Sequence, residues 1–509
     1  MAGIVAAAAV PAFILATTLA VFWVAEPGKG LSPADWAALR FTLWQAVLSS
    51  VFSIVLAIPV ARALARQSFR GRGVLITLLG APFLLPVIVA IFGLLAVFGR
   101  GGIVNLVLGA FGLPEVSIFG LHGVVLAHVF FNLPLATRLI LQGWLDIPAE
   151  RYRLAASLGM DARAINRHLE RPMLRQVVPG AALVIFVLCT TSFAVALTLG
   201  GGPKATTVEL AIYQALRFEF DLSRAAFLSL VQLAMTVVLA LLAFRYLRGA
   251  GFARGLDRPL QRWDGAGGWR PVFDFGVIGL AAVFLLLPIL AVLLRGLPEV
   301  PSLPWAVWVS ALRSLGVALA STAIVVSLAL AMASAVTRLK GRGRWVEIAG
   351  LTAIAASPLV MGTGLFVLIF PFANPEALAL PVTVLVNAVV TLPFALRALV
   401  PAYQAVEDDF GRLAASLGMS GWAHLRLVVL PRLRRPLGFS AGIAAALSMG
   451  DLGVIALFAD PEAATLPLQV YRLMGAYRMD EASGAAVLLL ILSFALFWVC
   501  DRGVRRAEV

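Results

Sequence analysis

The polar-edged octapeptide Arg-Leu-Ala-Ala-Ser-Leu-Gly-Met occurs twice in the chain, at residues 153–160 and again at 412–419. A segment of this kind, repeated inside an otherwise apolar sequence, predicts that two halves with one plan make the same contact twice. We expect the two segments to dock on a partner protein, because two matching protrusions suit a two-fold symmetric partner that receives each one in a groove. The alternative is a pair of loops that only connect membrane spans.

Each copy is predicted to form two short helices joined by a bend. Asp146 can cap a first helix that Pro148 opens, because a carboxylate accepts from the free amides of a first turn and proline suits that turn. Gly159 then ends this helix in the left-handed conformation that glycine adopts at low cost. Asp161 caps a second helix, which we expect to stop near Pro172.

The second copy repeats this pattern along the chain. Gly418 is the stop, Ser420 is the cap, and Pro431 marks the start of the next span. We therefore expect each half to project a bent pair of short helices from the membrane.

A second kind of chemistry is indicated by Asp451, which lies inside an apolar stretch. An ionisable group at that depth is costly and usually faces the interior of a helix bundle or a water-filled path. The matched position in the first half is Ser192. Further along the chain, Thr206 of the first half is matched to Thr465 of the second. All four lie in or beside glycine-containing segments, whose irregular backbone a membrane tolerates only when it is packed in protein or lines a cavity. They are candidates for a translocation path or gate; the alternatives are a structural helix cap or ion pair for Asp451, and plain external loops.

The composition predicts what positions these residues. Of the 509 residues, 61% are hydrophobic and 13% are charged, and the mean hydropathy is +0.97. So little polar surface cannot cover a water-soluble globule of this length. We predict an all-α polytopic membrane protein.

A membrane-spanning helix needs roughly 20 apolar residues, and the sequence has about twelve such stretches. Prolines interrupt the third and the ninth of them. The predicted spans are 3–24, 41–61, 75–98, 121–142, 179–199, 225–245, 273–294, 309–335, 346–371, 381–400, 437–458 and 484–501.

The basic residues set the predicted orientation. Most of the 40 lysine and arginine residues fall on one side if both termini are cytoplasmic, as the positive-inside rule requires. An even number of spans per half makes the two halves parallel, related by an axis along the membrane normal. We expect a first half at 1–247, a cytosolic linker rich in Gly and Arg at 248–271, and a second half at 272–509.

Other function classes are excluded by what the sequence lacks. The net charge of +14 comes from short cytoplasmic loops, without the long basic runs of a nucleic-acid surface. The histidines and the two cysteines lack metal-ligand spacing, so no metal site is predicted. The segment 200–207 does not have the spacing of a nucleotide-binding P-loop, so we expect no catalytic residues here and ATP hydrolysis in a separate subunit.

The repeated pattern resembles the EAA motif of binding-protein-dependent ABC importer permeases. The matching residues are Ala155, Gly159, Leu169 and Pro172 in the first half, and Ala414, Gly418, Val428 and Leu430-Pro431 in the second. The chain departs from the motif at its opening glutamate, which is Arg153 and Arg412 here, at the next alanine, which is Leu154 and Leu413, and at Arg171.

The resemblance implies two copies of a type I importer (MetI-like) transmembrane domain, each with six helices. It implies coupling helices that fit a homodimeric ATPase, a periplasmic substrate-binding protein as the second partner, and a location in the bacterial inner membrane. ATP and Mg would be bound by the ATPase, and no cofactor by this chain. The coupling residues would be Arg153, Ala155, Gly159, Asp161, Pro172, Arg412, Ala414, Gly418, Ser420 and Pro431.

The cargo is indicated by two longer stretches. Residues 192–216 and 448–478 resemble the permeases of the thiamine importer family. Thiamine is a cation, and a carboxylate at Asp451 would offset its desolvation on the path. The alternatives are the same class with ferric iron or another small solute, and an ATP-independent carrier of twelve helices, which would leave the duplicated bent helices without a role.

Overall fold

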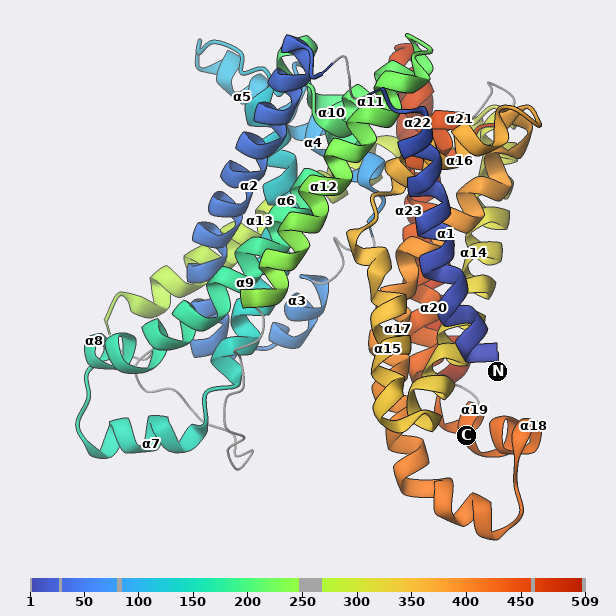
Figure 1. The fold of residues 1–509 in the computed structure, drawn as a ribbon. Coiled ribbons are helices and arrows are strands. Elements are labelled where there is room, and N and C mark those ends of the chain that lie inside the picture. Colours follow the sequence, from blue (N-terminus) through green and yellow to red (C-terminus); the bar gives the residue numbers. More distant parts are fainter. Residues whose placement is uncertain (1, 27–29, 80–84, 247–267, 459–462, 506–509) are drawn as a thin grey trace.

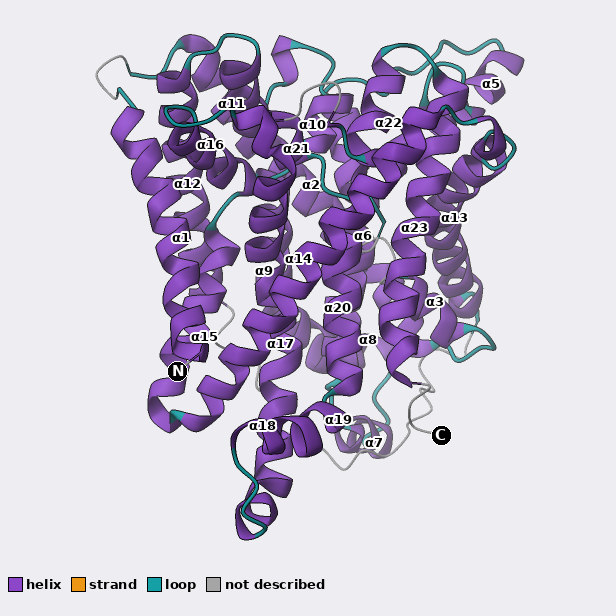
Figure 2. Ribbon diagram, turned by 90° about the vertical axis from the view of Figure 1, so that its right-hand side faces the viewer, coloured by secondary structure: helices purple, strands orange, loops and turns teal. Residues whose placement is uncertain are grey.

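The computed structural model describes residues 2–26, 30–79, 85–246, 268–458 and 463–505. Within these ranges every regular element is a helix (Figure 2). The helices are α1 (Ala2–Val24), α2 (Pro33–Arg66), α3 (Arg72–Leu78), α4 (Val87–Phe98), α5 (Ile103–Ala110), α6 (Leu121–Leu145), α7 (Ala149–Ser157), α8 (Ala162–Ile165), α9 (Arg171–Thr190), α10 (Ala194–Leu199), α11 (Val208–Arg217), α12 (Leu222–Tyr246), α13 (Arg270–Gly296), α14 (Trp305–Arg338), α15 (Gly343–Leu351), α16 (Pro358–Ile369), α17 (Ala379–Ser416), α18 (Gly421–His424), α19 (Leu430–Arg432), α20 (Arg434–Met449), α21 (Gly453–Phe458), α22 (Leu466–Gly475) and α23 (Met479–Arg505).

Eleven helical segments of the described chain are long and apolar enough to cross a membrane. The chain is therefore a multi-pass, all-α membrane protein. The expected ninth span is the one missing from these eleven segments, because the chain leaves the helical conformation at Ala356 and Ser357 and only the short helix α16 follows. A proline disfavours the helical conformation of the residue before it, and Pro358 follows these two residues.

Two three-helix bundles form the centre of the molecule. In one, α2, α6 and α9 pack against one another, and in the other α14, α17 and α20 do so. Each bundle encloses matched polar contacts: Ser49 with His128 at 3.3 Å in the first, and Ser448 with Ser321 at 3.2 Å and Asn387 at 3.0 Å in the second. Such hydrogen bonds fix the register of helices whose apolar faces slide easily in lipid.

The first helix of each half packs against the other half. Helix α1 lies along α14, α15 and α16, whereas α13 lies along α4. The close approach occurs at glycines, since a Cβ atom at Gly364 would overlap Thr17 of α1, and one at Gly93 would lie 2.6 Å from the carbonyl oxygen of Pro288 in α13. Two crossings of the same kind thus tie the halves together.

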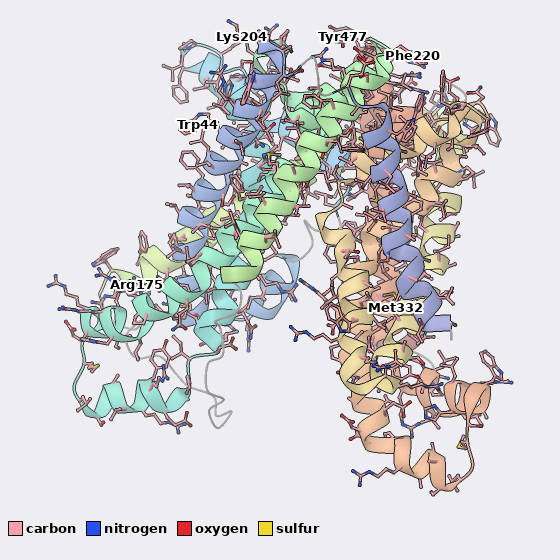
Figure 3. All side chains as sticks on the ribbon, in the orientation of Figure 1. Trp44, Arg175, Lys204, Phe220, Met332 and Tyr477 are labelled. Atoms are coloured by element: carbon pink, nitrogen blue, oxygen red, sulfur yellow. The ribbon has the colours of Figure 1, made fainter. Side chains whose placement is uncertain are left out.

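The two bundles are closest at the end that carries α10, α11, α21 and α22, and they diverge toward the end that carries α7 and α18 (Figure 1). Both chain ends lie at this second end (Figure 1). Around the bundles, large apolar side chains such as Trp44 on α2, which is 57% exposed, point outward (Figure 3), as expected of a surface that contacts lipid. The expected linker at 248–271 lies almost wholly outside the described residues.

Candidate coupling surface and pathway

The first octapeptide forms the expected helix and bend. Helix α7 ends at Ser157, and Gly159 has a φ of +63°, in the left-handed region. The amide of Met160 donates to the carbonyl of Ala155 at 2.9 Å, which closes the turn. The carboxylate of Asp161 then accepts from the amide of Ala164 at 2.8 Å, so this cap is confirmed.

The second octapeptide closes in the same way but starts its next helix differently. Gly418 has a φ of +67°, and the amide of Met419 donates to the carbonyl of Ala414 at 2.9 Å. Ser420 is the residue before α18, yet its side chain makes no capping hydrogen bond. Gly421, the first residue of α18, has a φ of +57°, in the left-handed region. The expectation of a side-chain cap at Ser420 is therefore wrong.

The repeated segments present a matched apolar surface. Ala155 and Ala414 are buried, whereas the leucines on either side of them are exposed by 57 to 67%. These leucines are Leu154, Leu158, Leu413 and Leu417. In each copy the pair is spaced by four residues, which places both side chains on one face of the helix. We call these four residues the leucine faces; they lie at the far ends of the two diverging bundles (Figure 1).

The arginines that replace the motif glutamate stand beside these faces. Arg153 and Arg412 are both exposed at the same positions of the two copies. A partner at this surface would meet two cations and four leucines, arranged alike in the two halves.

Two expectations about helix boundaries are wrong. Asp146 does not cap α7; it ends α6, where its carboxylate accepts from the side chain of Gln142 at 2.9 Å. The second short helix does not stop at Pro172, where a π-helical turn leads directly into the continuous helix α9. In the second half a π-helical turn also precedes Pro431, but the helix is interrupted at Leu433, two residues beyond it. A π turn widens the helix and so accommodates a residue that lacks an amide hydrogen.

At the opposite end, α11 and α22 are matched helices. The amide of Val208 donates to the hydroxyl of Thr42 at 2.9 Å, and the amide of Leu466 donates to that of Ser314 at 2.8 Å. The residue that precedes α11 is Thr207, just as Thr465 precedes α22. Thr465 is therefore matched by Thr207, one residue further along than the expected Thr206.

Both matched helices end in a strained turn. Phe220 and Tyr477 have φ values of +52° and +60°, and are the only non-glycine residues of the described chain with positive φ. Both lie at the α11/α22 end (Figure 3). Phe220 also contacts the ring of Phe366 on α16 and that of Phe370, which directly follows α16, in the other half. Strain of this kind is held only where the surrounding packing enforces it.

Asp451 and Ser192 occupy the same kind of place, the break between a long helix and a short one. The carboxylate of Asp451 accepts from the amide of Gly453 at 3.2 Å and so caps α21. Its other oxygen is buried and has no hydrogen-bond partner among the described residues. A Cβ atom at Gly453 would lie 3.7 Å from Asp451 Oδ1 and 3.8 Å from the ring of Phe193, so the two breaks lie next to each other.

Glu209, a carboxylate that we did not predict as a site residue, joins the two halves near these helix breaks. Glu209 of α11 is fully buried, and the hydroxyl of Ser357, in the second half, donates to it at 2.6 Å. Helix α11 is outside the eleven membrane-crossing segments, and burial raises the pKa of Glu209 to about 8. A further contact between the halves joins Arg217 to Glu376 at 3.2 Å.

Comparison with known proteins gives the family. No family model matches the chain. It is 39% identical over 477 residues to the thiamine transport system permease protein ThiP of Brucella abortus (strain 2308), covering 92% of this chain and 87% of that protein. It is 38% identical over 518 residues to the protein of the same name from Escherichia coli (strain K12), covering 98% and 96%.

A shorter relative matches about half of the chain. The probable ABC transporter permease protein y4oQ of Sinorhizobium fredii (strain NBRC 101917 / NGR234) is 30% identical over 228 residues, which cover 43% of this chain and 74% of that protein. The two longer matches extend over nearly the full length of both partners. The chain belongs to the family of thiamine transport system permease proteins.

Proposed function

We propose that this chain is the membrane-spanning permease subunit of an ATP-driven importer that carries thiamine or thiamine phosphates into the bacterial cytoplasm. The observation that carries the proposal is the pair of matched leucine faces, which project at one end of a polytopic membrane protein. Exposed apolar side chains in a fixed, repeated arrangement are typical of a docking surface. The names of the relatives support thiamine as the cargo.

The partners follow from this arrangement. A homodimeric ATPase receives α7 and the end of α17 in its two clefts, and it binds the ATP and Mg. A periplasmic binding protein delivers the cargo at the α11/α22 end. The α7/α18 end and both termini are then cytoplasmic, in the inner membrane, as the distribution of basic residues favours.

Transport is a shift between two arrangements of the halves. The bundles meet at the α11/α22 end and diverge at the other, which is the arrangement expected of a path closed to the periplasm (Figure 1). ATP binding closes the ATPase dimer, draws the leucine faces together and separates α11 from the second half. The energy of that change comes from contacts that differ between the two arrangements.

The path is proposed to pass the two helix breaks. Asp451 has one carboxylate oxygen with no described partner, so it can offset the desolvation of a cation while the other oxygen still caps α21. Ser192, Thr206 and Thr465 contribute hydroxyl groups on the same route. Asp451→Asn keeps the cap acceptor but removes the charge, so we expect thiamine uptake to fall while the protein level in the membrane is unchanged. Unchanged uptake would remove Asp451 from the path.

The direct test is uptake of labelled thiamine into cells that lack their own importer. The chain is coexpressed with its ATPase and binding protein, and unlabelled thiamine phosphates and ferric iron serve as competitors. ATP-dependent uptake that thiamine or its phosphates suppress is the expected result. A well-expressed, ATPase-bound complex without uptake would contradict the cargo, and a chain that never copurifies with the ATPase would contradict the class.

A further inference from the structure

At the root of α9 lies an ionic cluster around a buried carboxylate, which the described residues of the second half do not repeat. Glu170 is fully buried at the last position of the π turn that leads into α9. Its Oε2 atom lies 2.7 Å from a guanidinium nitrogen of Arg62 on α2, and Arg66 lies 4.0 Å from Oε1. The indole nitrogen of Trp144 on α6 donates to Oε1 at 3.3 Å. One carboxylate thus joins α2, α6 and the root of α9.

The corresponding place in the second half has a valine where the first half has the carboxylate. Val429 is the last residue of the second π turn and is fully buried. Tyr403 stands where the first half has Trp144, and Ser334 stands where it has Arg62, since α2 and α14 have the same length and matched hydrogen bonds. The same backbone turn is therefore packed with a valine in one half and with a carboxylate in the other.

The backbone above these two places also differs. Helix α17 continues without a break from the membrane to Ser416, so it carries Leu413 of the second leucine face and ends next to Leu417. In the first half α6 ends at Leu145, and the chain is extended at Pro148 before α7 begins. A displacement of the second leucine face therefore moves α17 directly. A displacement of α7 does not move α6 in the same way, because the two helices are separate.

We propose that Glu170 is a positioning residue for ATPase coupling: with Arg62 and Trp144, it links the root of α9, and so α7, to α2 and α6, as the continuous α17 does in the second half. The proposal rests on the proposed function, because it assigns the route by which that coupling acts. The chemistry fits this role, since a buried carboxylate that is paired adds little net stability compared with apolar packing, whereas its distances to Arg62 and Trp144 specify how α2 and α6 meet the root of α9.

The first experiment measures thiamine uptake per ATP hydrolysed in the reconstituted complex. Glu170→Gln is expected to keep the ATPase bound and its hydrolysis rate within about twofold, while uptake per ATP falls about tenfold, within the usual range for coupling between sites. The matched control is Glu407→Gln, which disturbs a contact with His424 at 3.7 Å beneath the second leucine face but leaves α17 continuous. It should leave uptake per ATP unchanged.

The deciding variant carries the residues of the second half into the first, Glu170→Val with Arg62→Ser and Trp144→Tyr. If the cluster only fills space, these three substitutions replace it with the packing that already serves the second half, and coupling returns to the wild-type value. The proposal expects the protein to assemble with the ATPase and yet remain poorly coupled, because α7 still lacks a continuous helix. Wild-type coupling in this variant would overturn it.

A measurement without cargo separates this inference from the proposed function. Spin labels at Ser157→Cys and Arg70→Cys, with Cys189→Ser and Cys500→Ser to remove the native thiols, report the position of α7 relative to the end of α2. Glu170→Gln should broaden this distance distribution, and an unchanged distribution would contradict the proposed link. If the wild-type complex transports no thiamine, the proposed function fails while this measurement still decides the role of Glu170.

Discussion

The two halves carry the same octapeptide on different supports. In the second half the leucine face ends a helix that runs unbroken from the membrane, over an apolar root at Val429. In the first half it lies on a separate short helix, α7, over the carboxylate of Glu170. The bend is alike in both because its hydrogen bonds are local. The comparison teaches that a contact surface is kept identical by a few neighbouring residues, while its attachment depends on residues far away in the sequence.

The halves also differ at the opposite end. Helix α11 reaches into the second half through Glu209 and Arg217, which contact Ser357 and Glu376. The matched helix α22 has no acidic residue. The carboxylate contact that Glu209 makes between the halves therefore has no acidic counterpart on α22.

The largest effect should come from the bends, where the halves agree. Gly159→Pro and Gly418→Pro each place a residue restricted to a φ near −65° at a position that requires about +65°. Each substitution alone should abolish ATP-dependent thiamine uptake, with the protein still inserted in the membrane. Uptake that survives in only one of them would show that the two bends are not equivalent.

A nearly equal loss is expected from charging the leucine faces. Leu154→Asp with Leu158→Asp, and Leu413→Asp with Leu417→Asp, replace exposed apolar contacts without touching a buried residue. Both double variants should lose the ATPase on affinity purification, because a buried carboxylate without a partner opposes binding. Leu106→Asp, on the exposed face of α5 at the opposite end, serves as the control and should retain the ATPase.

A smaller effect should distinguish α11 from α22 by its pH dependence. Burial raises the pKa of Glu209 from an ordinary value near 4.5 to about 8. The Glu209 carboxyl therefore binds its proton more tightly when α11 contacts the second half than when the two are separated. The closed form is therefore fully favoured below pH 4.5 and loses stability as the pH rises toward 8. Spin labels at Lys204→Cys and Phe372→Cys, in a protein without native cysteines, should report separation of the halves over this range. Glu209→Gln should make the distance independent of pH, and a persisting trend would exclude this carboxyl as its cause.

The smallest effect separates the two caps. Asp161→Ala removes an observed hydrogen bond to the amide of Ala164 and should cost about 1 kcal/mol. Ser420→Ala removes no capping bond and should change stability by a few tenths of a kcal/mol at most. Thermal unfolding of the two variants and the wild-type protein in detergent, measured under the same conditions, checks this difference in stability. Equal losses would mean that Ser420 caps α18 after all.

The sequence was most informative where structure depends on near neighbours. The glycine bends and the Asp161 cap are confirmed because each is closed by hydrogen bonds between residues a few positions apart. It was misleading at Pro172, where proline rules predict a stop but a π turn carries the helix past it. It could not select Glu209, because one acidic residue in an external segment is ordinary unless its burial is known.

The sequence alone determined that this is an all-α membrane protein with a duplicated bend, because hydropathy and turn chemistry act over short distances. Only the tertiary structure decided which helices are neighbours. Helix α1 lies on α16 where Thr17 meets Gly364, and α13 lies on α4 where Pro288 meets Gly93. In lipid the hydrophobic effect does not favour one apolar neighbour of a helix over another. The packing of α1 and α13 against the other half therefore depends on steric fit at a few small residues. Steric fit of that kind exists only once both surfaces are present.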